Sequence, residues 1–206
     1  MLVFWQQSLV YMAIPKTGTT ALEETFSSQA DLVLRNPPEV KHAHAYRFRT
    51  FLKPFLDRAG PPKAWQIVTV VRDPMDWLSS WWRYQSAEHH RDHPRSCIGV
   101  PYADWIEEVL SNAPPLRAQV GSQTFFVADR GKMITDRIFA YEHLDDCASW
   151  LAAVVGGTAR LPRRNVSPRE RVALSDELQQ RVSAHFAEDM RLHSAALASG
   201  ARGWTP

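Results

Sequence analysis

The stretch SLVYMAIPKTGTT, residues 8–20, changes from an apolar run to a short loop and then to helical character. Residues 8–14 are apolar enough for a buried strand, and Pro15 ends the run. The residues after Thr20 read ALEETF, with acidic side chains in the early turns of an expected helix. The stretch therefore predicts a strand, a loop and a helix in direct succession.

The same succession occurs twice more along the chain. QIVTVV, residues 66–71, is rich in β-branched residues, which suits a strand buried on both faces, and a helical pattern follows it. RIFAY, residues 137–141, precedes a third helical segment that Gly156 and Gly157 are expected to end. Strands that alternate with helices are typical of a parallel sheet. We therefore expect an α/β fold, with three αβα layers around a central parallel sheet.

The length of 206 residues suits one domain with a few excursions. We expect a single domain over residues 1–206, with a surface excursion or lid at residues 88–101 and a long amphipathic C-terminal helix near residues 174–198. Hydrophobic residues make up 45% of the chain and charged residues 22%, which excludes disordered, collagen-like and coiled-coil proteins.

Charge and cysteine content narrow the class of protein further. A formal net charge of +2 is too small for a whole surface that binds nucleic acid, so any affinity for anions must be local. Cys97 and Cys147 have no CxxC partner, which predicts reduced thiols rather than a disulfide or zinc framework. No apolar run reaches the ~18 residues of a membrane span, and no secretory leader is evident. We expect a cytoplasmic protein.

Residues 15–20 form a candidate phosphate loop. The loop joins a strand to a helix, where free backbone N–H groups and the positive end of the helix dipole attract an anion. Gly18 lets the backbone approach a phosphate closely, and Lys16 adds a mobile charge. A Walker A motif is excluded, because its lysine follows the second glycine whereas Lys16 precedes the only glycine. A turn that only caps the helix is the alternative.

A second candidate anion site follows the second strand. Arg72 closes that strand, Asp73 and Pro74 begin a helix, and Ser80 stands eight residues after the arginine. At 100° per residue, Ser80 lies about 80° beyond two full helical turns, so both side chains can reach one phosphate. An arginine–aspartate pair that only caps the helix is again the alternative.

Two segments, IPKTGTTAL at 14–22 and VVRDPMDWLSSWW at 70–82, resemble the cofactor-binding signatures of the sulfotransferases that use 3′-phosphoadenosine 5′-phosphosulfate (PAPS), especially the carbohydrate and bacterial branches. The resemblance covers roughly residues 8–170. It includes FAYEHL at 139–144 and RRNVSP at 163–168. It implies a P-loop-like sulfotransferase fold.

The resemblance also implies roles for individual residues. In that family the first loop binds the 5′-phosphosulfate, and an arginine with a serine eight residues later holds the 3′-phosphate, as Arg72 and Ser80 would. Lys16 would stabilise the bridging oxygen as the sulfur–oxygen bond breaks. A late segment would fold over the nucleotide. The cofactor-binding candidates are therefore Lys16, Thr17, Gly18, Thr19, Thr20, Arg72, Ser80, Arg163, Arg164 and Ser167.

Transfer of a sulfuryl group to an alcohol also needs a base for the hydroxyl proton. KHAHA, residues 41–45, stands where related enzymes carry a catalytic histidine or glutamate. Histidine suits this task because its ordinary pKa of about 6.5 leaves much of it neutral near pH 7. Bacterial relatives favour His42 and heparan-type relatives favour His44, so both stay open. If the segment is extended, the two rings face the same way.

Two other groups of residues compete for a chemical role. Glu23 and Glu24 are rival base candidates, although acidic residues at this place also complement the helix N-terminus. His89, His90 and His93 form a cluster without a cysteine or a second kind of ligand nearby, so no metal site is expected.

The sequence thus predicts a sulfotransferase that moves a sulfuryl group from PAPS to a hydroxyl acceptor of small-molecule or glycan type, favouring a carbohydrate. The transfer would be in-line, with a histidine base and no metal, and would release 3′,5′-adenosine bisphosphate (PAP). The alternatives are a P-loop kinase-like phosphotransferase, which would need magnesium, and a nucleotide-binding module without catalysis. Relatives with the same donor loops act on varied acceptors, so acceptor identity and oligomeric state stay open.

Overall fold

A five-stranded sheet in the order β3-β1-β2-β4-β7 lies at the centre of the computed structural model, which describes residues 1–60, 64–162 and 173–206. Strands β2, β4 and β7 run parallel, as the alternation of strands and helices predicts. Strand β1 is antiparallel to both β2 and β3, so the sheet is mixed rather than wholly parallel. The strands are β1 (Leu2–Phe4), β2 (Leu9–Met12), β3 (Leu32–Val33), β4 (Gln66–Val71) and β7 (Arg137–Ala140).

The antiparallel pairing of β1 and β2 follows from the short turn between them. The backbone N–H of Ser8 donates to the Trp5 carbonyl oxygen at 3.2 Å, and Ser8 has a φ of 54°. A connection this short cannot make the crossover that a parallel pair needs, so the strands must be antiparallel. The apolar pattern of residues 8–14 does not predict β1, which precedes these residues in the chain.

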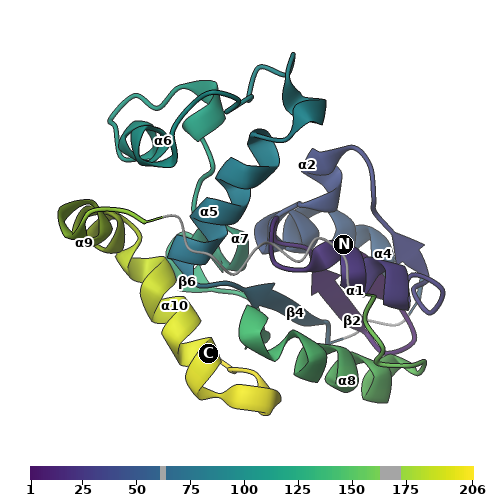
Figure 1. Cartoon of the computed structure of the whole chain (residues 1–206). Coiled ribbons are helices and arrows are strands. Elements are labelled where there is room, and N and C mark those ends of the chain that lie inside the picture. The colour runs from purple at the N-terminus through teal and green to yellow at the C-terminus, as the bar shows by residue number, and fades with distance from the viewer. Residues whose placement is uncertain (61–63, 163–172) are drawn as a thin grey trace.

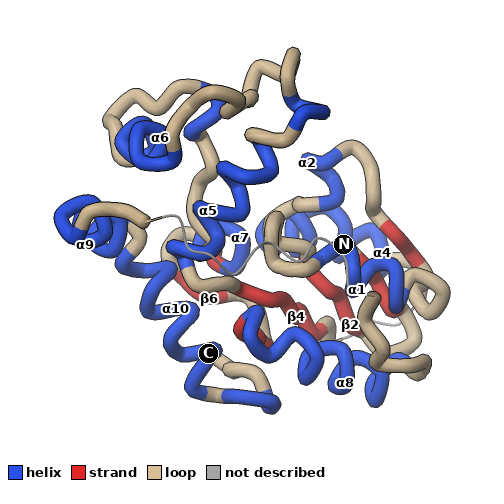
Figure 2. Tube along the Cα trace, viewed as in Figure 1, coloured by secondary structure: helices blue, strands red, loops and turns tan. Residues whose placement is uncertain are grey.

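Helices cover both faces of the sheet (Figures 1 and 2). On one face, α1 (Thr19–Phe26) and α8 (Leu144–Val155) contribute Leu22, Phe26 and Leu151 to a core with Val68 of β4. On the other face, residues 43–56 and α10 (Ala187–Ala198) pack against the strands. Strand β4 is buried from Ile67 to Val71, as expected of a strand between two layers.

A second apolar core lies beside the sheet and is built around α5 (Pro74–Gln85). Helix α5 leaves the carboxyl end of β4 and extends away from the sheet towards α6 (Tyr102–Val109), as Figure 1 shows. Trp77, Trp105 and Phe186 are buried together in this core. Residues 88–101, the expected excursion, connect α5 to α6 and begin with a 3₁₀ turn at Glu88–His90.

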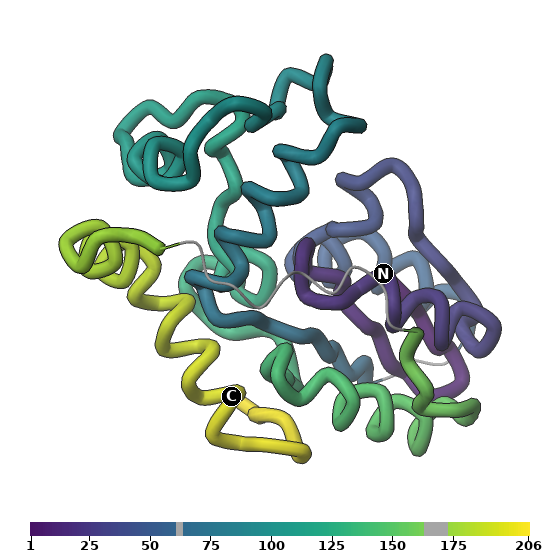
Figure 3. The backbone as a smooth tube through the Cα atoms, in the orientation of Figure 1, coloured from purple at the N-terminus to yellow at the C-terminus, as the bar shows by residue number. Residues whose placement is uncertain are grey.

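The prediction of one long helix near residues 174–198 is wrong, because the helix is broken at Phe186. Helices α9 (Asp176–His185) and α10 meet at this residue, whose φ of −99° and ψ of 28° are not helical. Phe186 and α9 pack into the core around α5, whereas Leu192 of α10 packs against the sheet. One straight helix cannot face both cores, so the chain bends, as the trace in Figure 3 shows.

Several short elements complete the described chain, and α8 ends as predicted, at Gly156 with a φ of 82°. None of the helices in residues 1–60, 64–162 and 173–206 is both long and apolar enough to cross a membrane. The short elements are α2 (Pro38–Lys41), α3 (Ala45–Arg47), α4 (Lys53–Asp57), α7 (Thr124–Val127), β5 (Ala128–Asp129) and β6 (Lys132–Met133).

Candidate functional site

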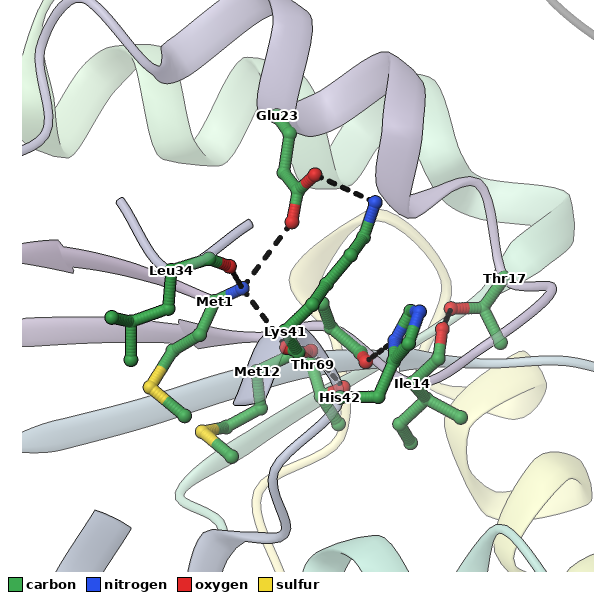
Figure 4. A network of polar contacts seen from close by, with 10 residues as sticks. Met1, Met12, Ile14, Thr17, Glu23, Leu34, Lys41, His42 and Thr69 are labelled. Carbon is green, nitrogen blue, oxygen red and sulfur yellow. Dashed lines mark hydrogen bonds and ion pairs between the residues drawn. The ribbon is translucent and has the colours of Figure 1, made fainter. Parts of the chain in front are cut away.

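The candidate phosphate loop lies at the carboxyl end of β2 and leads directly into α1. Lys16 and Gly18 have φ values of 65° and 78°, and these left-handed conformations turn the chain sharply before the helix begins at Thr19. The buried Thr17 hydroxyl donates to the Ile14 carbonyl oxygen at 2.9 Å and closes the turn (Figure 4). The Thr17 side chain, expected to contact a ligand, therefore holds the loop in shape.

The first turn of α1 leaves donors for an anion. The N–H groups of Ala21 and Leu22 donate to the Gly18 carbonyl oxygen, whereas those of Thr19 and Thr20 precede the first possible acceptor within the helix. Thr19 is buried and Thr20 is exposed. The hydroxyl of Thr20 and the two free main-chain N–H groups therefore remain as candidate contacts.

Gly18 packs closely against the FAYEHL segment. A Cβ at this position would lie 2.6 Å from Cδ2 of Leu144 and 3.2 Å from Cε2 of Tyr141. We expect Gly18→Ala to lower the free energy of unfolding by about 2 kcal/mol or more, because the left-handed backbone costs about 1–2 kcal/mol and the close contact adds to it.

Urea denaturation of Gly18→Ala and Gly131→Ala measures this difference. Gly131 has a φ of 76° but no atom within 4 Å of an added Cβ, so its variant carries only the conformational cost. Equal losses in the two variants would contradict close packing at Gly18.

The Lys16 side chain extends from the loop towards α5. Its Nζ atom lies 3.8 Å from the ring centroid of Tyr84 and 6.0 Å from that of Trp81. Aromatic faces attract a cation, and this contact holds the ammonium group at the site. Burial, together with the charge of Arg72, lowers the pKa of Lys16 to about 8. Lys16 is thus mostly protonated at pH 7, and an anion beside it would raise its pKa.

Arg72 extends from the end of β4 to the loop that follows β2. Its Nη1 atom donates to the Lys16 carbonyl oxygen at 3.3 Å, and its guanidinium carbon lies 4.4 Å from the Tyr141 ring centroid. Its Nε atom is buried and has no hydrogen-bond partner among the described residues. The two predicted anion sites therefore adjoin.

Lys16 and Arg72 are two cations that pair with no acidic side chain of the described residues. The ion pairs of the described residues involve neither side chain. Both side chains are partly buried, so solvent screens their mutual repulsion only in part. This arrangement favours the binding of an anion next to them.

The main chain of Arg72 is held in place by Gln123. The Arg72 N–H donates to Gln123 Oε1 at 2.8 Å, and Gln123 Nε2 donates to the Arg72 carbonyl oxygen at 2.7 Å. The buried carboxylate of Asp189, in α10, accepts the backbone N–H groups of Gln123 at 2.7 Å and Thr124 at 2.8 Å. These supports were not predicted, because no local pattern relates Gln123 or Asp189 to the arginine.

One face of α5 is turned towards the phosphate loop. Trp77, Trp81 and Tyr84 lie at helical spacing on this face, and Trp77 Nε1 donates to the Pro15 carbonyl oxygen at 2.8 Å. Trp81 and Tyr84 contact Lys16. Trp81 Nε1 is a second buried N–H without a partner among the described residues. The loop therefore packs against a row of aromatic side chains on α5. The sequence motifs alone do not predict this contact.

Ser80 shares this face of α5, and Ser79 does not. Helical geometry puts Ser80 between Trp77 and Tyr84, whereas Ser79 points away and donates its hydroxyl to the Asp76 carbonyl oxygen at 3.0 Å. Both serines are buried, and the Ser80 hydroxyl makes no hydrogen bond to any residue that the structure describes. Of the two hydroxyls, the one of Ser80 is therefore available to bond to a ligand.

His42 lies beside the phosphate loop with one ring nitrogen fixed. Its Nδ1 atom is 2.6 Å from the Ala13 carbonyl oxygen, and Figure 4 shows the ring next to Ile14 and Thr17. Because a carbonyl oxygen only accepts, Nδ1 carries the proton, and Nε2 of the neutral ring keeps its lone pair. Burial lowers the pKa of His42, which favours this neutral form. The ring is prepared to accept a proton at Nε2.

His44 is turned towards a different neighbour. Its ring lies 4.2 Å from the Phe125 ring and 4.9 Å from the Phe126 ring, measured between centroids, and its nitrogens bond to no described residue. The chain between the two histidines leaves α2 and enters α3, so it is not the extended segment in which both rings would face one way. Of the two base candidates, His42 is therefore the one that lies beside the phosphate loop.

Glu23, the rival base, is engaged in ion pairs. Its side chain is nearly inaccessible, with the residue 2% exposed. One oxygen accepts from the Met1 amino group at 3.2 Å and the other from Lys41 Nζ at 2.8 Å, as drawn in Figure 4. Because both oxygens are occupied, Glu23 positions the residue before His42 rather than acting as a base. Glu24 lies on the exposed side of the helix.

The remaining candidates lie in two other regions. His89, His90 and His93 touch through their rings, and His90 also packs against Tyr84 at 4.4 Å between centroids. Within the described chain, no three histidine, cysteine or acidic side chains are grouped to hold a metal ion. Three predicted cofactor contacts lie outside the described residues: Arg163, Arg164 and Ser167.

Two cavities lie away from the phosphate loop. One of about 650 Å³ is bordered by Phe125, Phe186 and Asp189, on the side of α7 that faces α9 and α10. The other, of about 580 Å³, is bordered by Lys53 and Asp136. The first shares the Phe125 ring with His44, so it adjoins the region of the two histidines.

No family model matches this chain, and neither does any curated protein or solved structure.

Proposed function

We propose that this chain is a PAPS-dependent sulfotransferase with a P-loop-like sulfotransferase fold, which transfers a sulfuryl group to a hydroxyl of a carbohydrate. The observation that carries the proposal is the pair of adjacent cations Lys16 and Arg72, which have no acid partner in the part of the chain that the structure describes. They follow two neighbouring parallel strands at the carboxyl edge of the sheet, where α/β proteins bind nucleotides.

The donor groups around these cations fit a doubly phosphorylated nucleotide. Arg72 Nε and Trp81 Nε1 are buried N–H groups without partners among the described residues, and such groups cost about 1–3 kcal/mol each when unpaired. Oxygen atoms of an anion would satisfy them. The start of α1 with Lys16 would hold the 5′-phosphosulfate, and Arg72 with Ser80 would hold the 3′-phosphate.

The chemistry assigned to the chain is proton transfer and charge stabilisation. PAPS, when bound, supplies a sulfuryl group on a phosphate leaving group. His42 Nε2 would take the proton of the acceptor hydroxyl as the new sulfur–oxygen bond forms, and the Ala13 carbonyl oxygen would stabilise the resulting imidazolium through Nδ1–H. Lys16 would balance the charge that develops on the leaving phosphate as the old bond breaks.

Binding of PAP and of adenosine 5′-phosphate tests the proposal by calorimetry. We expect PAP to bind at least about tenfold more tightly, because Arg72 and Ser80 would make charge-assisted hydrogen bonds to the 3′-phosphate worth about 1.5–3 kcal/mol each. Ser80→Ala should remove about tenfold of this preference. Ser79→Ala, the matched control on the opposite side of α5, should leave it unchanged. Equal binding of the two nucleotides would overturn the assignment.

A transfer assay separates the proposed function from its alternatives. Radiolabelled PAPS is incubated with an acceptor library in EDTA, and labelled acceptor is the expected product. A requirement for magnesium and ATP would instead support the phosphotransferase. Tight binding of PAP without transfer to any acceptor would support the nucleotide-binding module.

A further inference from the structure

Residues 45–57 form one continuous helical rod made of α3, a π-helical turn at Phe48–Leu52 and α4. One side of the rod belongs to the core, where Ala45, Phe48 and Leu56 are buried. The opposite side carries two large apolar rings in solvent: Phe51 is 67% exposed and Phe55 is 68% exposed.

Phe51 and Phe55 are four residues apart, and this spacing places two side chains on the same side of a helical rod. The wider π-helical turn at Phe48–Leu52 does not disturb this arrangement. Phe48, Leu52 and Leu56 therefore line up towards the core. Residues 47, 51 and 55 line up on the outer side, so Phe51 and Phe55 form a single ridge instead of two scattered side chains.

The exposed side of the rod is also positively charged. Arg47 and Arg58 are exposed near the two ends of the ridge. Asp57 is the one acidic residue between 45 and 58, and it accepts hydrogen bonds from Lys53 Nζ at 2.5 Å and Trp65 Nε1 at 2.8 Å. The arginines of this face therefore carry a net positive charge.

We propose that this aromatic-basic face docks the protein on the surface of an anionic lipid bilayer. Rings that are two-thirds exposed project from the protein surface. Projecting rings can insert between lipid headgroups, whereas a flat protein surface could not enclose them. The arginines at both ends match the negative phosphates of such a leaflet. The face consists of Tyr46, Arg47, Phe51, Phe55 and Arg58.

This inference is independent of the proposed sulfotransferase activity and of PAP binding. The rod contributes none of the side chains assigned to the donor, and it begins after His44 in the chain. Binding of lipid without binding of nucleotide would refute only the proposed function. Binding of nucleotide without binding of lipid would refute only this inference.

Flotation with phospholipid vesicles tests the inference on the full chain. We expect binding to vesicles that contain phosphatidylserine and none to vesicles of phosphatidylcholine alone. Replacing both rings, Phe51→Ser with Phe55→Ser, should lower partitioning at least about tenfold. Phe125→Ser, which changes an aromatic ring of similar exposure on α7, should leave it unchanged. Arg47→Gln with Arg58→Gln should weaken binding and reduce its dependence on salt.

A second measurement detects insertion directly. Both native cysteines are buried, so a Phe51→Cys variant offers one accessible thiol for a bimane label, and Ser149→Cys on α8 serves as its control. A blue shift on vesicles containing phosphatidylserine is expected at position 51 and not at position 149. Absence of binding to these vesicles would overturn the inference. So would binding that depends on salt but not on the two phenylalanines, which would indicate a general polyanion surface.

Discussion

Replacing His42 with alanine is expected to lower the rate of sulfuryl transfer by about 10²- to 10⁴-fold, the usual contribution of a positioned general base. Affinity for PAP should change little, because His42 faces the acceptor proton in the proposed reaction and makes no assigned contact to the nucleotide. Steady-state transfer of radiolabelled sulfate and calorimetry with PAP measure the two quantities. His44→Ala is the comparison, and its rate should fall much less, since that ring packs on Phe125 and Phe126.

The dependence of transfer on pH follows from the same histidine. Burial lowers the pKa of His42 below its ordinary value of 6.5, so the neutral base persists into mildly acidic solution. The rate should therefore fall only as the pH drops through this lowered pKa, and the fall should disappear in His42→Ala. A loss in His44→Ala that equals or exceeds the loss in His42→Ala would refute the choice of His42.

Replacing Lys16 with alanine is expected to lower transfer by about 10²- to 10³-fold, as removal of a group that stabilises developing negative charge does. The variant should also bind PAP more weakly, because Arg72 alone would then face the phosphates. Binding of PAP by the unchanged protein should weaken as the pH rises through about 8, where Lys16 loses its charge. Calorimetry over this pH range measures that loss.

Lys16→Arg supplies the matched control for the charge. Arginine stays protonated at all these pH values, so binding of PAP by this variant should be nearly constant across the same range. The backbone at this position is left-handed in either case, so the two variants carry a similar conformational cost. Transfer that survives Lys16→Ala undiminished would remove this lysine from the mechanism.

The parallel part of the sheet could be predicted because each strand carries its own signal. Residues 8–14, 66–71 and 137–141 are short apolar runs that end at turn residues, and β2, β4 and β7 lie within them. Strand β1 was missed because its direction depends on a four-residue turn whose sequence, WQQS, has no glycine or proline to mark it. The break at Phe186 was missed because helical periodicity does not reveal that two cores compete for one helix.

Part of the candidate site could be predicted from the sequence, namely the residues that directly follow the end of a strand. Lys16 and Arg72 each follow the end of a strand, and the structure brings them into contact, whereas Ser80 lies two turns into α5 and its role stays a prediction. The choice between His42 and His44 could not be made from spacing, because it depends on the path of the chain between α2 and α3. Tyr84, Tyr141 and Gln123 support the two cations from distant segments, and such contacts depend on the tertiary fold.

The bonds from Asp189 through Gln123 to Arg72 also bear on how the protein is made. During synthesis the strand that carries Arg72 leaves the ribosome long before α10 does. Until that late helix docks, Asp189 does not hold Gln123, whose amide group bonds to the main chain of Arg72. The sheet edge that carries Arg72 therefore lacks one of its supports until α10 has been synthesised and has docked.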